Sequence, residues 1–505
     1  MGPSGEPRYC RAETSRTSGQ REFARGLRLF DSTMIVVGSM IGSGIFIVSA
    51  DVARTVGSAG LLLAVWVVTG AVTIAAALSY GELAAMMPAA GGQYVYLREA
   101  YNPLVAFLYG WTLFLVIQTG TIAAVAVAFA KFTAVIVPWF GEHHAALRVG
   151  RLSVSWAQVL AIASIAVLTF INLQGLRQGK IVQNLFTFTK VAALVGLIAC
   201  GIFIGKNEAA VSANFSDLWK GTWTHVARGG AGSVEPLSGI MVLAAIGVAM
   251  VGSLFSSDAW NNITFTAAEV VRPRITIPLS LAIGTATVTL LYVLANVSYL
   301  VVLPLKGTPN AVDVMGRGIQ FAAADRVATA AVSAVFGDAA IAIMAVLIMI
   351  STFGCNNGLI LAGARVYYAM AKDGLFFRRA GTLNARSVPA WALICQGVWA
   401  SLLCVSGSYG DLLDYVIFAV LLFYVLTIVG LFILRRKRPG DDRPYKAVGY
   451  PVVPGLYILI ALGICVDLLI FKPSYTWPGV VIVLLGIPVY YAWARSLTRR
   501  PVRDG

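Results

Sequence analysis

The chain has 505 residues, of which 58% are apolar and only 12% charged, and its formal net charge is +15. A soluble chain of this length needs far more charge to cover its surface, so the composition excludes an ordinary soluble protein. The basic residues lie in short segments between apolar blocks rather than on one folded face. This distribution argues against a nucleic-acid-binding protein and indicates membrane topology.

Twelve apolar blocks follow one another along the chain, each long enough to approach or span a bilayer as a helix of about 20 residues. Several are longer, which tilt or ends protruding into water would explain. The predicted spans are 31–56, 60–87, 101–138, 155–173, 181–204, 239–271, 276–304, 332–371, 388–405, 409–433, 452–471 and 476–494. They predict one all-α polytopic membrane domain over residues 27–495, between a tail at 1–26 and a tail at 496–505.

The distribution of Lys and Arg predicts how the spans are oriented. About 25 of the 38 fall in the two tails and the even-numbered connections, and about 9 in the odd-numbered ones. Because basic loops stay on the cytoplasmic side, both termini are predicted to be cytoplasmic and the location a cell membrane. Residues 205–238 would then form a long exposed outer loop, and Arg54 would extend to the lipid headgroups.

Cysteines and histidines give no sign of a metal centre or an enzyme. Their spacing suits neither a disulfide framework nor a zinc site, and no membrane nucleophile motif is present. No metal or cofactor is therefore expected. The residues concerned are Cys10 in the tail, five cysteines inside apolar blocks (Cys200, Cys355, Cys395, Cys404, Cys465) and three loop histidines (His143, His144, His225).

Two apolar blocks are interrupted by small polar residues at mid-depth. The first block contains Val-Gly-Ser-Met-Ile-Gly-Ser-Gly-Ile-Phe at 37–46, and the sixth contains Val-Gly-Ser-Leu-Phe-Ser-Ser-Asp-Ala-Trp at 251–260. One interpretation is close helix packing through small residues. The other is that both helices are discontinuous, which is tolerated at membrane depth only where the backbone lines a cavity or is buried in protein.

A broken helix offers what a free amino acid needs. The second half begins with unpaired N–H groups and a positive dipole end, which attract a carboxylate, while the carbonyls ending the first half attract an ammonium. Gly42 and Gly44 would permit the turn and the close approach of a carboxylate. The breaks open two five-helix halves, about 27–204 and 239–433. Paired interruptions of this kind indicate a transporter site between inverted repeats, here followed by two extra helices at about 452–494.

Several segments resemble one known family. The stretch Met-Ile-Gly-Ser-Gly-Ile-Phe at 40–46 resembles the first-helix signature of amino acid–polyamine–organocation transporters, and is most similar to the bacterial relatives of the L-type amino acid transporter branch. Further segments resemble later parts of that family in the same order, so the resemblance covers about 27–495. They are 80–83 with 91–101, 364–374, and 443–445 with 449–451.

The resemblance implies a leucine-transporter-type fold with helices one and six broken and with substrate held at the breaks. The amides of Ser43 and Gly44 would hold the substrate carboxylate. Phe255 would cover the substrate as a gate. The carbonyls of Met40, Phe255 and Asp258 would hold the ammonium. The full implied site comprises Met40, Ile41, Gly42, Ser43, Gly44, Ile45, Phe255, Ser256, Ser257, Asp258 and Asn261. Relatives often have Tyr and Gly where this chain has Ser257 and Ala259, so side-chain specificity stays open.

Two ionisable residues lie inside spans, where a charge costs roughly 2.5–3.5 kcal/mol. Asp258 could pair with the substrate ammonium or bind a proton, but the preferred interpretation is an N-cap for the second half of helix six. Lys190 could extend to the headgroups, although its depth makes that awkward. The resemblance instead places it against the first break with Ser351 and Thr352, where its ammonium would replace the sodium ion of sodium-coupled relatives.

These observations predict a sodium-independent amino acid transporter working by alternating access, through exchange or proton-coupled symport. A polyamine or amine permease of the same superfamily is the main alternative, and a channel or an enzyme is less favoured. Glu82 and Glu269 would pair with nearby arginines, as gate contacts or as ordinary interfacial salt bridges. Substrate amino acid and lipid are the expected partners. Eukaryotic light chains of this family join a heavy chain through a cysteine after helix three. Residues 141–155 have none, so no disulfide-linked heavy chain is expected.

Overall fold

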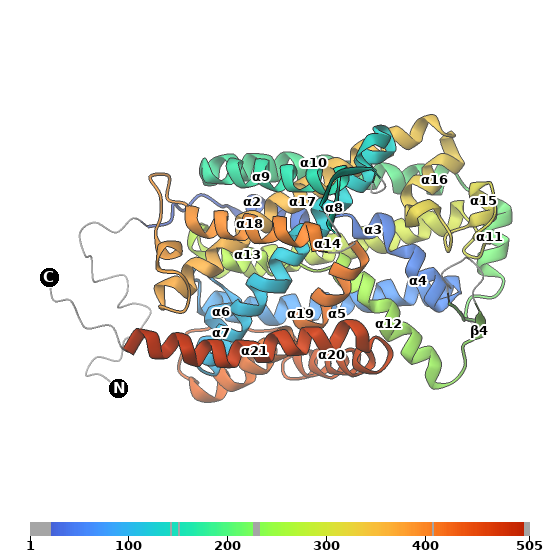
Figure 1. Ribbon diagram of the computed structural model, residues 1–505. Helices are drawn as coiled ribbons and strands as arrows, with labels where there is room; N and C mark the ends of the chain where they lie inside the picture. The colour runs from blue at the N-terminus through green and yellow to red at the C-terminus, as the bar shows by residue number, and fades with distance from the viewer. Residues whose placement is uncertain (1–21, 142–143, 150–151, 226–232, 407–408, 499–505) are drawn as a thin grey trace.

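The computed structural model describes residues 22–141, 144–149, 152–225, 233–406 and 409–498, and it is a bundle of long helices (Figure 1). Ten of its described helices are long and apolar enough to cross a membrane. Two shorter apolar helices, Ile240–Ser256 and Ala390–Val405, account for the remaining predicted blocks six and nine. The predicted polytopic helical fold is confirmed, and the protein is a multi-pass membrane protein.

The first five spans correspond to α2 (Leu29–Met40) with α3 (Gly44–Ile47) and α4 (Ser49–Val56), α5 (Ala59–Met86), α7 (Pro103–Thr112) with η1 (Leu113–Ile117) and α8 (Gln118–Ile136), α9 (Trp156–Leu173), and α10 (Leu176–Ala199) with η3 (Cys200–Ile204). The next five are α12 (Ile240–Ser256) with α13 (Asn262–Phe265) and η4 (Ala267–Glu269), α14 (Pro273–Val302), α17 (Ala339–Lys372), α18 (Ala390–Ser406) and α19 (Tyr409–Lys437). The last two are α20 (Val452–Phe471) and α21 (Pro473–Thr498).

Local capping explains where several spans begin. The Ser58 hydroxyl accepts a hydrogen bond from the Leu61 amide at the start of α5, and the Asn102 side chain accepts one from Val105 at the start of α7. Pro103 follows Asn102 at the first helical position, where its missing N–H leaves no bond unmade. These caps fix the ends of spans whose interiors are held by apolar packing.

Helix packing in the first half is repeated in the second. In the first half α2 packs on α10, and α8 packs on α9; in the second α12 packs on α19, and α17 on α18. Between the halves, α2 packs on α14 as α12 packs on α5, and α5 with α14 forms the most extensive pair. Exchanging the halves maps each of these pairs onto another, and the pair of α5 with α14 onto itself, as expected of the five-plus-five repeat.

The two ends of the bundle differ in what they carry. The described chain begins and ends at one end, here called the terminal end (Figure 1). The opposite, distal end carries α4, α11 (Glu208–Phe215), α15 (Val314–Arg317), α16 (Val327–Phe336) and the hairpin of β3 (Thr222–Thr224) with β4 (Val234–Pro236). A second antiparallel hairpin, β1 (Ala145–Val149) with β2 (Leu152–Ser155), joins α8 to α9.

Two sequence-based expectations about the distal end are wrong. Residues 205–238 are not simply an exposed loop, because α11 packs on α14 and Asn214 is only 6% exposed. The Asn214 amide donates to the carbonyls of Leu300 (2.7 Å) and Leu303 (2.8 Å). Arg54 does not extend to the headgroups. Its guanidinium lies 2.7 Å from the Asp325 carboxylate, and this ion pair satisfies the charge within the protein.

Candidate substrate-binding site

Both interrupted spans are discontinuous in the structure. Helix α2 ends at Met40 and α3 begins at Gly44, with Ile41 in an extended conformation between them (φ −75°, ψ 91°). Helix α12 ends at Ser256 and α13 begins at Asn262. The second break contains Ala259 at φ 65°, a left-handed conformation that a residue with a Cβ rarely adopts. The predicted breaks in helices one and six are confirmed.

The small residues of span six turn out to have two separate roles. The Gly-Ser pair at 252–253 lies inside α12, so the unwound stretch begins only at Ser257. A Cβ on Gly252 would lie 2.4 Å from the Val48 side chain, which shows that this glycine permits close helix packing. Unwinding is confined to the polar residues that follow. The two interpretations of small residues therefore each hold for one part of the segment.

The two breaks touch at Gly44. A Cβ there would lie 2.1 Å from the Ser256 hydroxyl oxygen and 2.9 Å from the Ser256 Cα atom. Neither Gly42 nor Gly44 has a positive φ, so their expected role in turning the backbone is wrong. Gly44 is needed for close approach instead. This contact brings the end of α12 against the start of α3.

Tyr292 of α14 joins both breaks, and nothing in the sequence pattern marks this residue. Its hydroxyl oxygen lies 3.0 Å from the Met40 carbonyl and 3.0 Å from the Ser256 carbonyl. Ser351 of α17 adds a further tie, with its hydroxyl 3.1 Å from the Gly42 carbonyl. Because the Tyr292 hydroxyl has a single proton, the Met40 carbonyl, expected to hold a substrate ammonium, shares this donor with the Ser256 carbonyl in this state.

Lys190 is buried against the first break. Its ammonium nitrogen lies 2.5 Å from the Gly38 carbonyl, 2.7 Å from the Ile41 carbonyl and 3.4 Å from the Ser351 carbonyl. Its residue is 1% exposed, so extension to the headgroups is wrong. Thr352, grouped with it from the sequence, instead donates to carbonyls one turn back on its own helix. Lys190 and Ser351 come together at the break, and the Thr352 side chain does not join them.

Asp258 lies in the second break but does not cap a helix. The N-cap position of α13 is Asn261, whose side-chain amide donates to Gln93 at 3.0 Å, so the capping hypothesis is wrong. One carboxylate oxygen of Asp258 instead accepts a hydrogen bond of 2.5 Å from the Tyr424 hydroxyl of α19. This contact ties the unwound part of span six to span ten.

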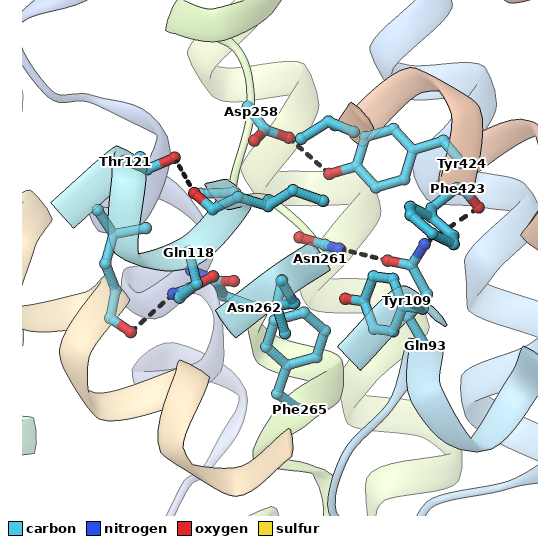
Figure 2. Close-up of a pocket in the computed structure, with 15 residues that line it drawn as sticks. Gln93, Tyr109, Gln118, Thr121, Asp258, Asn261, Asn262, Phe265, Phe423 and Tyr424 are labelled. Atoms are coloured by element: carbon cyan, nitrogen blue, oxygen red, sulfur yellow. Dashed lines mark hydrogen bonds between the residues drawn. The ribbon is translucent and has the colours of Figure 1, made fainter. Parts of the chain in front are cut away.

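Two small cavities meet at the breaks. The first, here called the break cavity, is lined by Ser39, Met40, Gly42, Ser43, Gly44, Thr121, Val125, Phe255, Ser256, Asp258, Ala259 and Cys355. The second, here called the side cavity, lies between spans three, six and ten (Figure 2) and is lined by Gln93, Tyr109, Leu113, Ile117, Gln118, Thr121, Asp258, Ala259, Asn261, Asn262, Phe265, Leu359, Val420, Phe423 and Tyr424.

These cavities are narrow in this state. In each cavity the centre of a water molecule can move within about 20 Å³. This is room for one or two waters but not for an amino acid. Of the predicted site residues, Ile41 and Ile45 are fully buried and do not line the break cavity, and Ser257 lines a third cavity together with Asp258. Binding of any amino acid at the breaks requires the surrounding helices to move apart.

Span three contributes a feature that the sequence did not indicate. Its helix passes through one π-helical turn, η1 (Leu113–Ile117), and both end residues of this turn line the side cavity. Such turns are rare and occur frequently at functional sites. Because η1 consists only of Leu, Phe, Val and Ile, no polar or small residue marks it in the sequence.

Two buried carboxylates pair with arginines at the terminal end. Arg365 of α17 holds Glu269 with two hydrogen bonds of 2.8 and 3.2 Å, and both side chains are at most 2% exposed. Glu82 of α5 lies 2.6 Å from Arg435 of α19 and 3.3 Å from Arg443. The predicted pairing of Glu82 and Glu269 with arginines is confirmed.

Residues 27–494 match the family model described as amino acid permease. The chain belongs to this family. Among curated proteins, this permease is 28% identical to the mouse b(0,+)-type amino acid transporter 1, over 96% of this chain and 92% of the relative. It is 30% identical to the mouse large neutral amino acids transporter small subunit 2 (95% and 83%) and 29% identical to the mouse Asc-type amino acid transporter 1 (92% and 80%). These relatives are transporters, and the permease is not an enzyme.

Proposed function

We propose that this permease is a sodium-independent secondary transporter of amino acids that works by alternating access, through exchange or proton-coupled symport. Relatives that align over nearly its whole length are named for amino acid transport. The site suits an amino acid, since the amides that begin α3 and the carbonyls that end α2 and α12 lie at one cavity. The cavities are too small for an amino acid in this state, which agrees with a cycle that opens and closes around the substrate.

The substrate carboxylate would bind at the start of α3. The first amides of a helix have no acceptor within that helix, and the dipole of the helical segment from Gly44 to Val56 favours a negative charge there. Ser43 and Gly44 both line the break cavity. The ammonium would lie toward Met40, Phe255 and Asp258, which line the same cavity. Binding would then require the Tyr292 hydroxyl to give up or share the Met40 carbonyl.

The main support for sodium-independent transport is the position of the Lys190 ammonium at the first break. Carbonyls at the end of an unwound helix form a negative pocket that needs a cation. Lys190 donates to two of them, from Gly38 and Ile41, at 2.5 and 2.7 Å. A fixed ammonium supplies this charge without an ion gradient.

The decisive experiment is uptake of labelled amino acids into proteoliposomes in sodium or choline buffer. We expect equal initial rates in the two buffers for the wild type. The initial rate of Lys190→Ala should be roughly tenfold or more below that of the wild type, because hydrogen bonds to a charged group contribute about 1.5–3 kcal/mol each. Lys190→Arg tests whether charge alone is sufficient, and Lys206→Ala removes an exposed lysine far from the site as a control.

Two outcomes would refute this assignment. One is strict sodium dependence of the wild type. The other is full activity of a Lys190→Ala protein that elutes as a single folded species. Comparing liposomes that are empty or preloaded with amino acid, with and without a pH gradient, separates exchange from proton symport.

We further propose that both termini are cytoplasmic and that the chain works without a disulfide-linked partner. One relative is named a small subunit, which implies that it assembles with another chain. In this permease the five cysteines of the described ranges all lie in spans and are free, and residues 141–155 contain none. Transport by the purified chain alone would support this, whereas strict dependence on a second protein would contradict it.

A further inference from the structure

The distal end contains a cavity beside the ends of spans three and eight, here called the distal cavity. It is lined by Val135 of α8, by Ile341 of α17 and by ten residues of the connection between 312 and 338. Its volume is about 250 Å³, more than ten times that of the break cavity. None of its described lining residues belongs to span one, six or ten, so it is separate from the candidate substrate-binding site.

Two arginines in the wall of the distal cavity have no counter-charge within ion-pair distance among the described residues. Arg317 and Arg326 are both half-buried. Each uses only its Nε donor, Arg317 toward the Ala311 carbonyl at 2.7 Å and Arg326 toward the Ala323 carbonyl at 3.3 Å. Burial lowers the pKa of Arg326, and no carboxylate offsets this effect. Because a guanidinium carries five N–H donors, most of those in the wall remain available to a ligand.

The acidic side chains nearby do not neutralise these arginines. Asp325, which precedes Arg326 in the chain, lies 2.7 Å from the guanidinium of Arg54. Asp338 is the one acidic side chain among the described residues of the wall, and it accepts a hydrogen bond from the Ser333 hydroxyl at 3.2 Å. The wall therefore carries two positive charges and one negative charge, which favours an anion.

Helix α16 adds to this attraction. Arg326, Thr329, Ala330 and Ser333 all line the cavity and lie three, four and seven positions apart, so the cavity runs along one face of the helix from its first turn. The side chain at the N-cap position, Arg326, makes no capping hydrogen bond. The first amides of a helix have no acceptor within it, and the helix dipole favours a negative charge at this end. An anion beside Arg326 would therefore also lie at the positive end of α16.

The distal cavity lies where lipid headgroups meet the hydrocarbon. Val135 is the last but one residue of α8, and Ile341 is the third residue of α17, at the distal end of the bundle (Figure 1). Further into α17, Ile343 and Val346 are exposed apolar side chains, and Val312 in the cavity wall is 97% exposed. On a membrane protein such a surface is covered by acyl chains. The ligand that fits both features has a negative headgroup and apolar chains.

We propose that the distal cavity binds the phosphate group of an anionic phospholipid, whose acyl chains lie along the exposed face of α17. Guanidinium groups recognise phosphate through paired, charge-assisted hydrogen bonds, and basic pockets between membrane helices bind lipid headgroups. Inorganic phosphate offers the same oxygens but has no chains to cover Ile343 and Val346. The lipid therefore binds more tightly than the free ion.

The test measures lipid binding to the purified full chain in a non-ionic detergent, from the rise in melting temperature as the ligand is added. The probes are dioleoyl phosphatidylglycerol, dioleoyl phosphatidylcholine and inorganic phosphate. Phosphatidylglycerol stabilises the wild type at concentrations at which the other two have little effect. Arg317→Gln and Arg326→Gln each weaken its binding roughly tenfold or more, because each removes charge-assisted hydrogen bonds.

Two further variants complete the set. Asp338→Asn removes the negative charge of the wall and binds phosphatidylglycerol several-fold more tightly, so it gives a reading even if an arginine variant does not fold. Arg274→Gln is the matched control, because Arg274 is an exposed arginine that pairs with Asp442 at 2.9 Å outside the cavity lining. It leaves lipid binding unchanged.

Four outcomes would overturn the proposal. Equal stabilisation by phosphatidylglycerol and phosphatidylcholine would mean that the chains alone are bound. An effect of inorganic phosphate as strong as that of the lipid would mean a site for a free anion. The third is a response to phosphatidylglycerol that is unchanged in both folded arginine variants, and the fourth is binding that is unchanged or weaker in Asp338→Asn.

Discussion

At the scale of single residues, the contact between Gly44 and Ser256 gives the sharpest prediction. A Cβ on Gly44 would collide with the Ser256 backbone at 2.9 Å, and a backbone atom cannot step aside as a side chain can. A Cβ on Gly42 would meet only the Cys355 side chain, with the sulfur at 3.1 Å and the Cβ atom at 3.7 Å. We therefore expect Gly44→Ala to abolish uptake in a protein that still folds. Gly42→Ala should retain a substantial part of the uptake, since overpacking against one side chain costs only about 1–3 kcal/mol.

Uptake rates, together with the melting temperature of each purified variant, check this prediction. Equal activity of the two variants would contradict it.

Among the residues of the candidate site, Gly44 and Lys190 could be singled out from the sequence because small or charged residues are conspicuous in an apolar span. Tyr292 could not, because a tyrosine is compatible with any span and the carbonyls beside its hydroxyl lie on other helices.

At the scale of helices, Tyr292 is the link between the two broken spans. Its hydroxyl lies 3.0 Å from one carbonyl at each break, while its ring packs edge-on against Trp66 at 5.4 Å. Tyr292→Phe keeps the ring and removes the link. We expect the free energy of unfolding to fall by the roughly 0.5–1.5 kcal/mol of one hydrogen bond, seen as a lower melting temperature. Uptake should be several-fold slower, because the breaks are no longer held together.

The matched control is Tyr101→Phe, which also removes one hydroxyl-to-carbonyl bond, to Leu426 at 2.8 Å, away from both cavities. It should lower stability by a similar amount and leave uptake nearly unchanged. If the two variants slow uptake equally, the link between the breaks has no special role in transport.

Element boundaries show where sequence patterns lose resolution. Small residues in span six marked the broken helix but could not place the break, because Gly252 serves packing while the residues from Ser257 onward unwind. Glycine permits both, and only the neighbouring helix decides between them. Helix α11 was missed for a related reason, since its eight residues are too few to show a clear periodicity within a polar connection.

At the scale of the whole molecule, the twelve spans were predictable because lipid leaves few alternatives: backbone polar groups must be paired within each apolar helix. The pairing of Glu269 with an arginine was predictable, but neither the identity of that arginine nor the backbone contact that joins the start of the first span to Glu269 was. At the terminal end the amides of Gly26 and Leu27, ahead of α2, bond to the Glu269 carbonyl at 2.9 and 3.0 Å. The Glu269 side chain bonds in turn to Arg365. Three segments distant in the sequence are joined there.

In the proposed alternating-access cycle this junction parts whenever the site opens at the terminal end, so its strength affects the rate of transport. Removing one member of a buried ion pair strands the other charge and costs about 3–5 kcal/mol, whereas replacing both with neutral residues of similar size is often tolerated. We therefore expect Glu269→Gln and Arg365→Met each to lower the melting temperature strongly. The double variant should recover much of that loss, and its uptake should exceed that of either single variant.

Thermal unfolding of the wild type, the two single variants and the double variant gives the interaction free energy between Glu269 and Arg365. The exposed pair of Lys206 and Glu208, 2.7 Å apart, is the control, and Lys206→Gln should change the melting temperature little because exposed pairs contribute about 0–1 kcal/mol. Strictly additive losses in the double variant would mean that Glu269 and Arg365 act independently. A non-additive recovery would show that the pair acts as one unit, as its two hydrogen bonds in a buried setting require.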